Sequence, residues 1–428
     1  MSFAIPTVGR EIDQADPRRR AWGVFGILFA LMVVDYVDRQ VVVSMFPHLK
    51  RHWLLSDAQL GALVSIISAT VALGTVPLSI LADRWSRVKS IFLMAVVWSV
   101  ATIACAFAGT YLQLIVARAA VGLGEAAYGS AGAALLATVF PERMRSTVLG
   151  AFLAAGLVGS VFGVMAGGVI AERWGWQAGF GAVGIPGLVL AFVFLMLVRD
   201  YRTVPIAAPA GRDDRLRARD VAAMLTRPRT VLVTCLAAGL QLVMVSTVYA
   251  WLPSFLNRFY GLAPDRAGLK TGVVVLLSGL GAVAWSVLAD RWSVRMPRAR
   301  IYVCSATAAA TAVLMALAFG AMSPGPAQFW MIVAGATAMT GTIGPAAAIV
   351  IDVVHPGVRA TAAAMLSLTQ NLFGLAAGPL LGGLISDAYG LPTALAVTPV
   401  FCLLSAVTFL FAARTYEGDL ARARAGAA

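Results

Sequence analysis

Long apolar segments, divided by short loops that hold Gly, Pro and charged residues, constrain this fold more than any single motif. A helix that crosses a bilayer needs roughly 20 apolar residues. With 60% hydrophobic and 12% charged residues, the composition is that of a membrane protein. The sequence therefore predicts an all-α membrane protein with twelve transmembrane helices, near residues 21–45, 58–82, 90–108, 111–138, 147–170, 177–198, 229–257, 267–289, 300–322, 327–352, 361–385 and 391–413.

Basic residues are distributed unevenly over the predicted loops. Most of the 33 Lys and Arg residues lie in alternate loops, near the two ends and in a polar linker. Because cytoplasmic loops carry excess Lys and Arg, both termini are predicted to be cytoplasmic, in a bacterial inner (plasma) membrane. Anionic head groups explain the net charge of +13 without a nucleic-acid partner. The predicted parts are a tail (1–20), a six-helix bundle (21–198), a linker (199–228), a second bundle (229–413) and a tail (414–428).

Two features recur along the chain and indicate an internal duplication. The octapeptide SILADRWS at 79–86 returns as SVLADRWS at 286–293, each time after the second apolar segment of its half. A glycine set in the fifth segment recurs as well, with Gly159, Gly163, Gly167 and Gly168 matching Gly374, Gly378, Gly382 and Gly383. We therefore expect two pseudo-symmetric bundles, with a site at their interface that opens alternately to each side.

These features resemble the major facilitator superfamily, over nearly the whole chain. Its cytoplasmic signature between the second and third helices is GxLADRxGR, and this chain departs from it at Ser79 and Ser86. The resemblance implies a charge latch, since carboxylates can face helix N-termini and arginines can pair with acids across a closed interface. Charges that only set the topology are the alternative. The predicted gate residues are Asp83, Arg84, Arg87, Asp290 and Arg291.

Five charged residues lie inside the first and fourth apolar segments: Asp35, Asp38, Arg39, Arg118 and Glu125. A charge at the bilayer centre costs about 2.5–3.5 kcal/mol even on insertion scales, so five of them indicate a site. Asp35 and Arg39 are one helical turn apart and share a face, and Arg118 and Glu125 line one stripe. A purely structural ion-pair cluster is the alternative.

The helix rise predicts the depth of these charges. With outer boundaries near Val42 and Tyr111, Asp35 and Arg118 would lie about 10 Å deep, and Glu125 about another 10 Å further in. The three acids exceed the two arginines by one negative charge. A proton would neutralise the cluster, and an anionic ligand that occupied an arginine would favour that proton. We therefore predict proton coupling, with carriers Asp38, Glu125 and Asp35.

A narrower resemblance rests on the two charged runs. Asp35-Tyr-Val-Asp38-Arg39 and the run from Arg118 through Gly-x-Gly to Glu125-Ala-Ala resemble the spinster-type branch of lysolipid and sphingolipid transporters. The anion:cation symporters carry a similar pattern. In both groups the matching acids are implicated in proton coupling and the arginine in substrate contact. The resemblance therefore implies that Arg39 and Arg118 bind substrate, and that the protein is a monomer.

The second half predicts the chemical class of the substrate, because its only interior charge is Asp352 near a helix end. A free sugar would need many hydrogen bonds, whereas a charged half facing an apolar half suits an amphiphile such as a lysolipid. A proton symporter of a small organic anion, a sugar acid or carboxylate, is the alternative. The further candidate substrate contacts are Tyr36, Tyr249, Gln241, Gln370 and Asn371.

Other classes of protein fit the sequence less well. A membrane-embedded enzyme would need a nucleophile–base pair or a metal-ligand cluster, and neither spacing is present. Four single cysteines lie in apolar runs, where we interpret them as packing residues: Cys105, Cys235, Cys304 and Cys402. A channel would more often build its pore by oligomerisation. We expect no cofactor and no metal, and as partners a small-molecule or lipid substrate, protons and membrane lipids.

Overall fold

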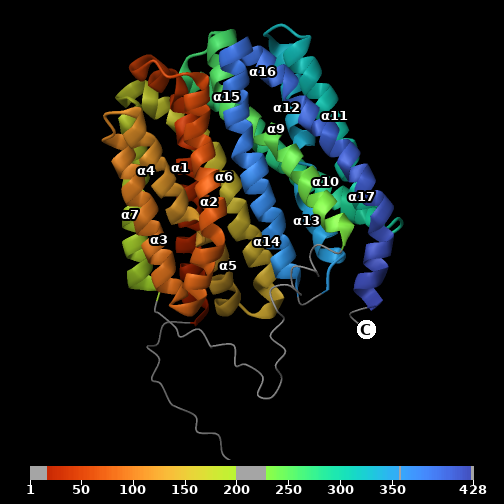
Figure 1. The fold of residues 1–428 in the computed structure, drawn as a ribbon. Helices are drawn as coiled ribbons and strands as arrows, with labels where there is room; N and C mark the ends of the chain where they lie inside the picture. The colour runs from red at the N-terminus through yellow and green to blue at the C-terminus, as the bar shows by residue number, and fades with distance from the viewer. Residues whose placement is uncertain (1–16, 199–227, 356–357, 426–428) are drawn as a thin grey trace, which may run out of the picture.

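The computed structural model describes residues 17–198, 228–355 and 358–425, and within these ranges the chain forms helices joined by short loops (Figure 1). The first part contains α1 (Pro17–Trp53), α2 (Asp57–Arg84), α3 (Arg87–Ala106), α4 (Tyr111–Glu125), α5 (Tyr128–Val139), α6 (Glu142–Trp174) and α7 (Trp176–Leu197). The second contains α9 (Arg229–Tyr260), α10 (Pro264–Ser293), α11 (Ala299–Gly320), α12 (Pro326–Met339), α13 (Ile343–Asp352), α14 (Arg359–Thr369), the π-helical η2 (Gln370–Leu375), α15 (Ala377–Tyr389), α16 (Leu391–Val397) and α17 (Pro399–Ala425).

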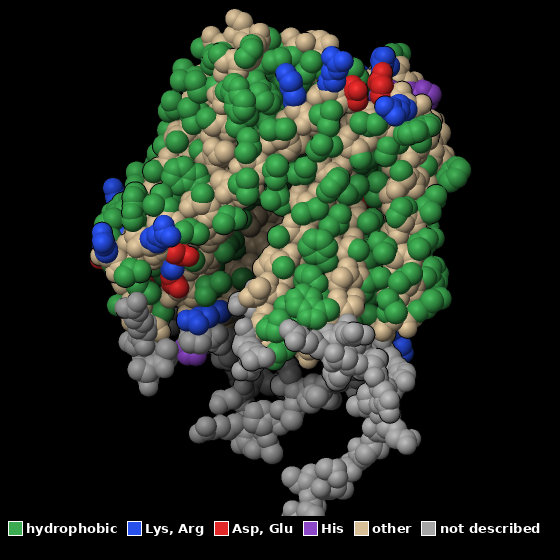
Figure 2. All heavy atoms as spheres, turned by 180° about the vertical axis from the view of Figure 1, so that it is seen from behind, with side chains coloured by type: hydrophobic (Ala, Val, Ile, Leu, Met, Phe, Trp, Pro, Cys, Tyr) green, Lys and Arg blue, Asp and Glu red, His purple; other side chains and the backbone are tan. Residues whose placement is uncertain are grey.

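The described helices form a bundle whose sides are apolar. Among the residues that the structure describes, eleven spans are long and apolar enough to cross a membrane, and the twelfth predicted span is the shorter pair α4 and α5. Exposed side chains such as Leu153, Phe162 and Trp330 face outward, and the charges visible in Figure 2 gather toward the two ends. The predicted fold class is therefore confirmed. Residues 199–227 of the predicted linker and 1–16 of the predicted tail lie outside the described residues, and the domain boundaries stay a prediction.

Two spans are broken at corresponding places in the repeat. The fourth span divides at residues 126–127 into α4 and α5, and the tenth divides at residues 340–342 into α12 and α13. A break leaves backbone carbonyls without a helical partner, and the Ala126 carbonyl accepts a hydrogen bond from the Thr75 hydroxyl at 3.0 Å. The prediction of one continuous helix at 111–138 is therefore wrong. A continuous helix would bond the Ala126 carbonyl internally, whereas here the Thr75 side chain of α2 bonds it instead.

The repeated glycines lie where helices approach most closely. A Cβ atom at Gly159 would come within 2.4 Å of the Val33 carbonyl oxygen on α1. A Cβ atom at Gly378 would come within 2.4 Å of the Val243 carbonyl oxygen on α9. Small residues allow such contact between membrane helices, so the same device packs α6 on α1 and α15 on α9.

The last glycine of each set contacts the other half of the chain. A Cβ atom at Gly168 on α6 would meet the Pro264 carbonyl oxygen of α10 at 2.5 Å. A Cβ atom at Gly383 on α15 would meet the Asp57 carbonyl oxygen of α2 at 2.4 Å. The glycine repeat therefore also joins the halves, through α6 with α10 and α2 with α15.

Gly159→Ala should lower the thermal unfolding temperature in detergent by several degrees. The added methyl must push α1 away, and overpacking of this kind costs about 1–3 kcal/mol. Gly150→Ala on the same helix is the control, because nothing lies within 4 Å of its Cβ position. Equal melting temperatures for the two variants would contradict the close contact of α6 with α1.

Candidate functional site

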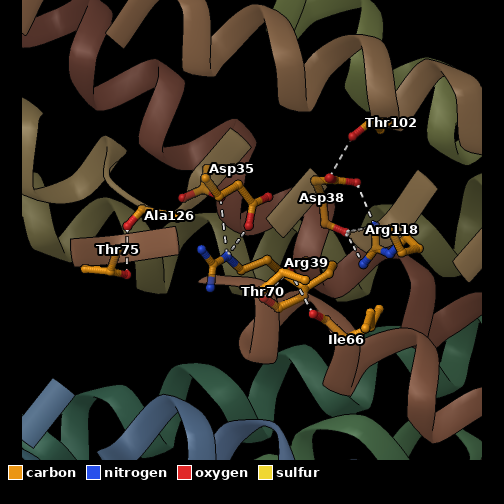
Figure 3. Close-up of polar contacts among 11 residues, drawn as sticks. Asp35, Asp38, Arg39, Ile66, Thr70, Thr75, Thr102, Arg118 and Ala126 are labelled. Atoms are coloured by element: carbon orange, nitrogen blue, oxygen red, sulfur yellow. Dashed lines mark hydrogen bonds and ion pairs between the residues drawn. The ribbon is translucent and has the colours of Figure 1, made fainter. Parts of the chain in front are cut away.

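Two glycines bring the charged face of α4 against its neighbours. A Cβ atom at Gly122 would lie 2.6 Å from the Ile67 carbonyl oxygen on α2, and one at Gly124 would lie 2.6 Å from the Trp98 backbone nitrogen on α3. A larger residue at either position would hold α4 away from these helices. The short distances place α4 against α2 and α3, and the hydrogen bond from Arg118 to Asp38 connects its charged stripe with α1 (Figure 3).

Asp38 and Arg118 form a fully buried ion pair. Arg118 Nη1 lies 3.1 Å from Asp38 Oδ1 and 3.4 Å from the Asp38 carbonyl oxygen. The Thr102 hydroxyl donates to Asp38 Oδ2 at 2.7 Å (Figure 3), and the guanidinium lies over the Phe180 ring, 5.7 Å from its centroid. One carboxylate thus meets one guanidinium and one hydroxyl, so its charge is compensated.

Arg39 contacts two carboxylates. Its Nε atom lies 3.3 Å from Asp35 Oδ1 and 2.9 Å from Glu125 Oε2. Both acids are buried, whereas 19% of the Arg39 side chain is exposed. Within the described residues the Glu125 oxygens receive no well-aligned hydrogen bond. The excess negative charge that the sequence predicts therefore lies on Asp35 and Glu125, which share one arginine.

The structure corrects which charges of α1 and α4 lie level with each other. The sequence analysis places Asp35 level with Arg118, but Arg118 contacts Asp38, and Asp35 shares Arg39 with Glu125. The reason is the length of α1, which continues to Trp53, well beyond the boundary assumed near residue 42. The buried charges therefore form one pair and one trio, whose members on α4, Arg118 and Glu125, lie about two helical turns apart.

A cavity of about 280 Å³ lies between the two halves. Arg39 and Tyr36 of α1 form part of one wall, and the Arg39 guanidinium lies 5.3 Å from the centroid of the Tyr36 ring. The wall from α9, α13 and η2 consists of aliphatic side chains with the hydroxyls of Ser246 and Tyr249. Arg39 is the one charged residue in the described lining. It therefore connects the buried acids with the space between the halves.

Three of the predicted substrate contacts line this cavity: Tyr36, Arg39 and Tyr249. The Tyr249 hydroxyl is hydrogen-bonded to the Ser278 hydroxyl on α10. Arg118 lies outside the described lining, buried behind Asp38. The sequence analysis missed three polar residues in the wall that the first half contributes. A single polar residue in an apolar helix predicts a cavity contact only when the rotation of that helix about its axis is known. The three missed residues are Gln40, Ser68 and Ser160.

The other predicted contacts lie away from the described lining of the cavity. Gln241 is fully buried, and its Nε2 donates to the Met339 carbonyl oxygen at 3.0 Å, where α12 ends. Gln370 and Asn371 begin the π-helical segment η2, and Asn371 Nδ2 donates to the Ser367 carbonyl oxygen at 2.9 Å. Gln241 and Asn371 therefore satisfy backbone groups where the helices are irregular.

The predicted gate of the first half can be placed only in part. The side chains of Asp83 and Arg84, at the end of α2, lie outside the described residues. Arg87 begins α3 and is half-buried. A latch through these three residues therefore stays a prediction.

The predicted gate of the second half forms contacts within its own half. Asp290 Oδ1 accepts a hydrogen bond from Arg300 Nε at 3.0 Å, and Arg300 Nη1 also lies 2.5 Å from Asp352 Oδ2. Arg291 is exposed. These contacts tie α10, α11 and α13 together and do not cross to the first half.

The halves are tied together at the opposite end from Pro17 and the C-terminal end of α17 (Figure 1). Asp57 at the start of α2 accepts hydrogen bonds from Arg258 Nη1 and Nη2 on α9, both at 2.7 Å, and from the Ser386 hydroxyl on α15. Asp387 accepts from the backbone nitrogens of Asp57 and Ala58 at 2.7 and 2.8 Å. These N–H groups have no partner within α2, so Asp387 also caps that helix. We call these contacts of Asp57 and Asp387 the Asp57 clasp.

The repeated halves and the cavity between them define a membrane transporter. A family model described as the Major Facilitator Superfamily matches residues 28–374 and 260–427. The chain belongs to the Major Facilitator Superfamily.

Similar proteins refine this assignment. The chain is 25% identical over 429 residues to the sphingosine-1-phosphate transporter SPNS2 of Mus musculus, covering 91% of this chain and 77% of the relative. It is 27% identical over 385 residues to protein spinster homolog 1 of Xenopus tropicalis (84% and 72% covered). An MFS-type efflux pump of Mycolicibacterium smegmatis is 28% identical over 397 residues, 90% of each chain. The predicted resemblance to spinster-type transporters is therefore confirmed.

Solved structures agree in fold. A bacterial homolog of the human lysosomal transporter Spinster, in an inward-facing and unoccupied conformation, superposes with a TM-score of 0.85 at 21% identity, covering 94% of this chain and 98% of that one. A D-xylose-proton symporter superposes with a TM-score of 0.71 at 17% identity, covering 91% and 97%. At these identities the likeness shows the shared fold alone.

Removing one partner of the buried pair should destabilise the protein strongly. Arg118→Met leaves the Asp38 carboxyl buried without its guanidinium, and breaking a buried pair in this way costs about 3–5 kcal/mol, so we expect a loss of folded protein or a much lower melting temperature. The double variant Asp38→Leu/Arg118→Met removes both charges and should recover a large part of this loss. A double variant that melts as low as Arg118→Met would contradict the pairing.

Asp57→Asn should loosen the contact between α2 and α9. The amide cannot accept the bidentate Arg258 pair as a carboxylate does. Distances between spin labels at the Asp57 end of these two helices should shift toward longer values. Glu172→Gln is the control, because this acid lies half-exposed and contacts His48 within its own half. Unchanged distances in Asp57→Asn would exclude Asp57 as a clasp.

Proposed function

We propose that the chain is a proton-coupled secondary active transporter that works by alternating access, and that its substrate is an amphiphile with an anionic head group, such as a lysolipid. The observation that carries the proposal is the position of Arg39, which contacts two buried carboxylates and lines the central cavity. An anionic head group at Arg39 would compete with Asp35 and Glu125 for the guanidinium. Because a buried carboxylate without a partner is costly, one of the two acids would then take up a proton.

In this arrangement, binding of the substrate head group favours binding of the proton, and binding of the proton favours binding of the head group. The head group weakens the ion pairs of the acids, and a proton on one acid frees the guanidinium for the head group. Such a coupling is reciprocal by thermodynamic necessity. Substrate and proton would therefore share one conformational cycle.

The three acids are unequal as proton carriers. Asp38 has its own guanidinium and a hydroxyl donor, so its charge is already compensated. Asp35 and Glu125 share a single arginine. We therefore assign the proton to Asp35 and Glu125, and to Asp38 the role of holding α1 against α3 and α4.

The two walls of the cavity support an amphiphile. The positive charge is on the α1 side, and the α9 side is mostly aliphatic. A head group would lie against Arg39, and a hydrocarbon chain against Leu242, Val245 and Leu375. The relative from Mus musculus is named a sphingosine-1-phosphate transporter, which supports this substrate class.

A proton symporter of a small organic anion is the second candidate. A cavity of about 280 Å³ is just below the usual range for small-molecule sites, roughly 300–1,000 Å³, and suits a ligand as small as a sugar acid. Gln40, Ser68, Ser160 and Ser246 on its walls could supply hydrogen bonds to hydroxyl groups. Arg39 would bind the carboxylate in this case.

The orientation follows from the distribution of charge. The positive-inside rule places the end with both termini in the cytoplasm. The Asp57 clasp then closes the outer side. A closed outer side is what an inward-facing state requires.

Glu125→Gln should abolish uphill uptake driven by a pH gradient in proteoliposomes. The amide is isosteric with the protonated acid but cannot exchange a proton. Substrate exchange at equal pH on both sides should persist, because Arg39 keeps Asp35. Glu417→Gln, at an exposed acid that pairs with Arg298, is the control and should transport like wild type. Undiminished pH-driven uptake in Glu125→Gln would remove this residue from the mechanism.

The substrate class is tested by the interior pH of proteoliposomes after addition of lysophosphatidylglycerol or gluconate. Proton movement with the lysolipid alone would support the amphiphile. Movement with gluconate alone would transfer the assignment to the organic-anion symporters. Arg39→Gln should abolish the response to either ligand, and a response that survives this substitution would contradict the proposed site.

A further inference from the structure

A second cavity, of about 810 Å³, lies in the second half, at the end of the bundle where α9 begins and α17 ends. It is separate from the cavity between the halves and shares none of its lining residues. Arg229 of α9 and Arg414 and Arg422 of α17 contribute to its walls. The acid among the described lining residues is Asp419. Three guanidinium groups and one carboxylate give this cavity a surplus of positive charge.

Asp419 is already engaged. It is buried, and its Oδ2 accepts hydrogen bonds from the backbone nitrogen and the hydroxyl of Thr230, at 3.0 and 2.7 Å. Its Oδ1 contacts Arg422. Arg229 and Arg414 form no ion pair within the described residues, and both are exposed. These two cations therefore carry the surplus charge of the cavity.

The apolar face of α17 leads directly to this cavity. Side chains at helical spacing along one stripe are about half-exposed, and a bilayer would cover them: Leu403, Leu404, Val407, Leu410 and Phe411. Arg414 continues the stripe at one turn after Leu410 and Phe411, and its guanidinium lies 4.9 Å from the centroid of the Phe411 ring. Arg422 follows two turns later on the same face. The stripe thus changes from apolar to cationic at Arg414, beside the cavity.

We propose that this cavity binds the head group of an anionic membrane phospholipid, whose acyl chains lie along the exposed stripe of α17. Arginine is suited to phosphate because its fork of N–H donors matches the phosphate oxygens. Basic pockets between membrane helices bind anionic head groups in this way. The lipid would join α9 to α17 at the membrane surface. This site does not depend on the function proposed for the central cavity.

The test compares ligands by thermal unfolding of the purified full chain in a neutral detergent. Short-chain phosphatidylglycerol should raise the melting temperature by several degrees, because a ligand that binds the folded state stabilises it. Phosphatidylcholine of the same chain length and inorganic phosphate are the comparison ligands. Equal shifts with phosphatidylcholine would overturn the proposal in favour of apolar chain binding. An equal shift with inorganic phosphate would identify a free-anion site and overturn the lipid assignment.

Variants locate the effect in the cavity. Arg229→Gln/Arg414→Gln should raise the half-saturating concentration of phosphatidylglycerol by about tenfold or more, since each arginine near a membrane surface contributes roughly a factor of five. Arg295→Gln, at an exposed arginine outside this cavity, is the matched control and should respond like wild type. If the double variant does not fold, Arg414→Gln alone should show about half of the effect on a logarithmic scale. Unchanged affinity in the Arg414 variants would overturn the proposal.

Discussion

The compensation of buried charge inside the first half constrains the rest of the structure. A charged side chain in the hydrocarbon region is tolerated when it is paired, and here two arginines serve three acids. The Asp38–Arg118 pair is complete and joins α1 to α4. Arg39 is shared by two acids, so its group has an uncompensated charge and a side chain that reaches the central cavity. The stable pair holds the helices, and the incomplete group is the one that can respond to a ligand.

Duplication supplied the framework, and the two halves then differ in chemistry. Both halves pack glycines against a long central helix, and both break their fourth helix. In the register that aligns Gly159 with Gly374, Glu125 corresponds to Thr340. The Thr340 hydroxyl donates to the Ser278 carbonyl oxygen at 2.6 Å, so the break in the second half is satisfied by a neutral group. The acid at the first break contacts Arg39, the charged residue of the cavity, whereas the second break offers no charge.

The two ends of the bundle differ in how the halves meet. At one end Asp57 and Asp387 tie α2 to α9 and α15. At the other end Asp290, Arg300 and Asp352 connect helices of the second half with one another. The halves are thus joined at one end, whereas the described contacts at the other end stay within one half. An alternating-access cycle would reverse this, opening the first end and joining the halves at the second. The sequence analysis predicts the opposite clasp at the motif around Asp83, whose side chain lies outside the described residues.

The sequence alone determined the helical membrane fold, the repeat with its recurring glycines, and the concentration of charge in α1 and α4. These follow from segment length, residue spacing and the cost of burying charge, which are properties of each segment by itself. The tertiary structure decided that Arg118 pairs with Asp38, that α4 breaks after Glu125, and that Tyr36 and Tyr249 reach the cavity whereas Gln241 does not. Each of these depends on how far one helix is shifted and turned against another. A shift of one residue moves a side chain by 1.5 Å and rotates it by about 100°, and no pattern within a single segment records that relation.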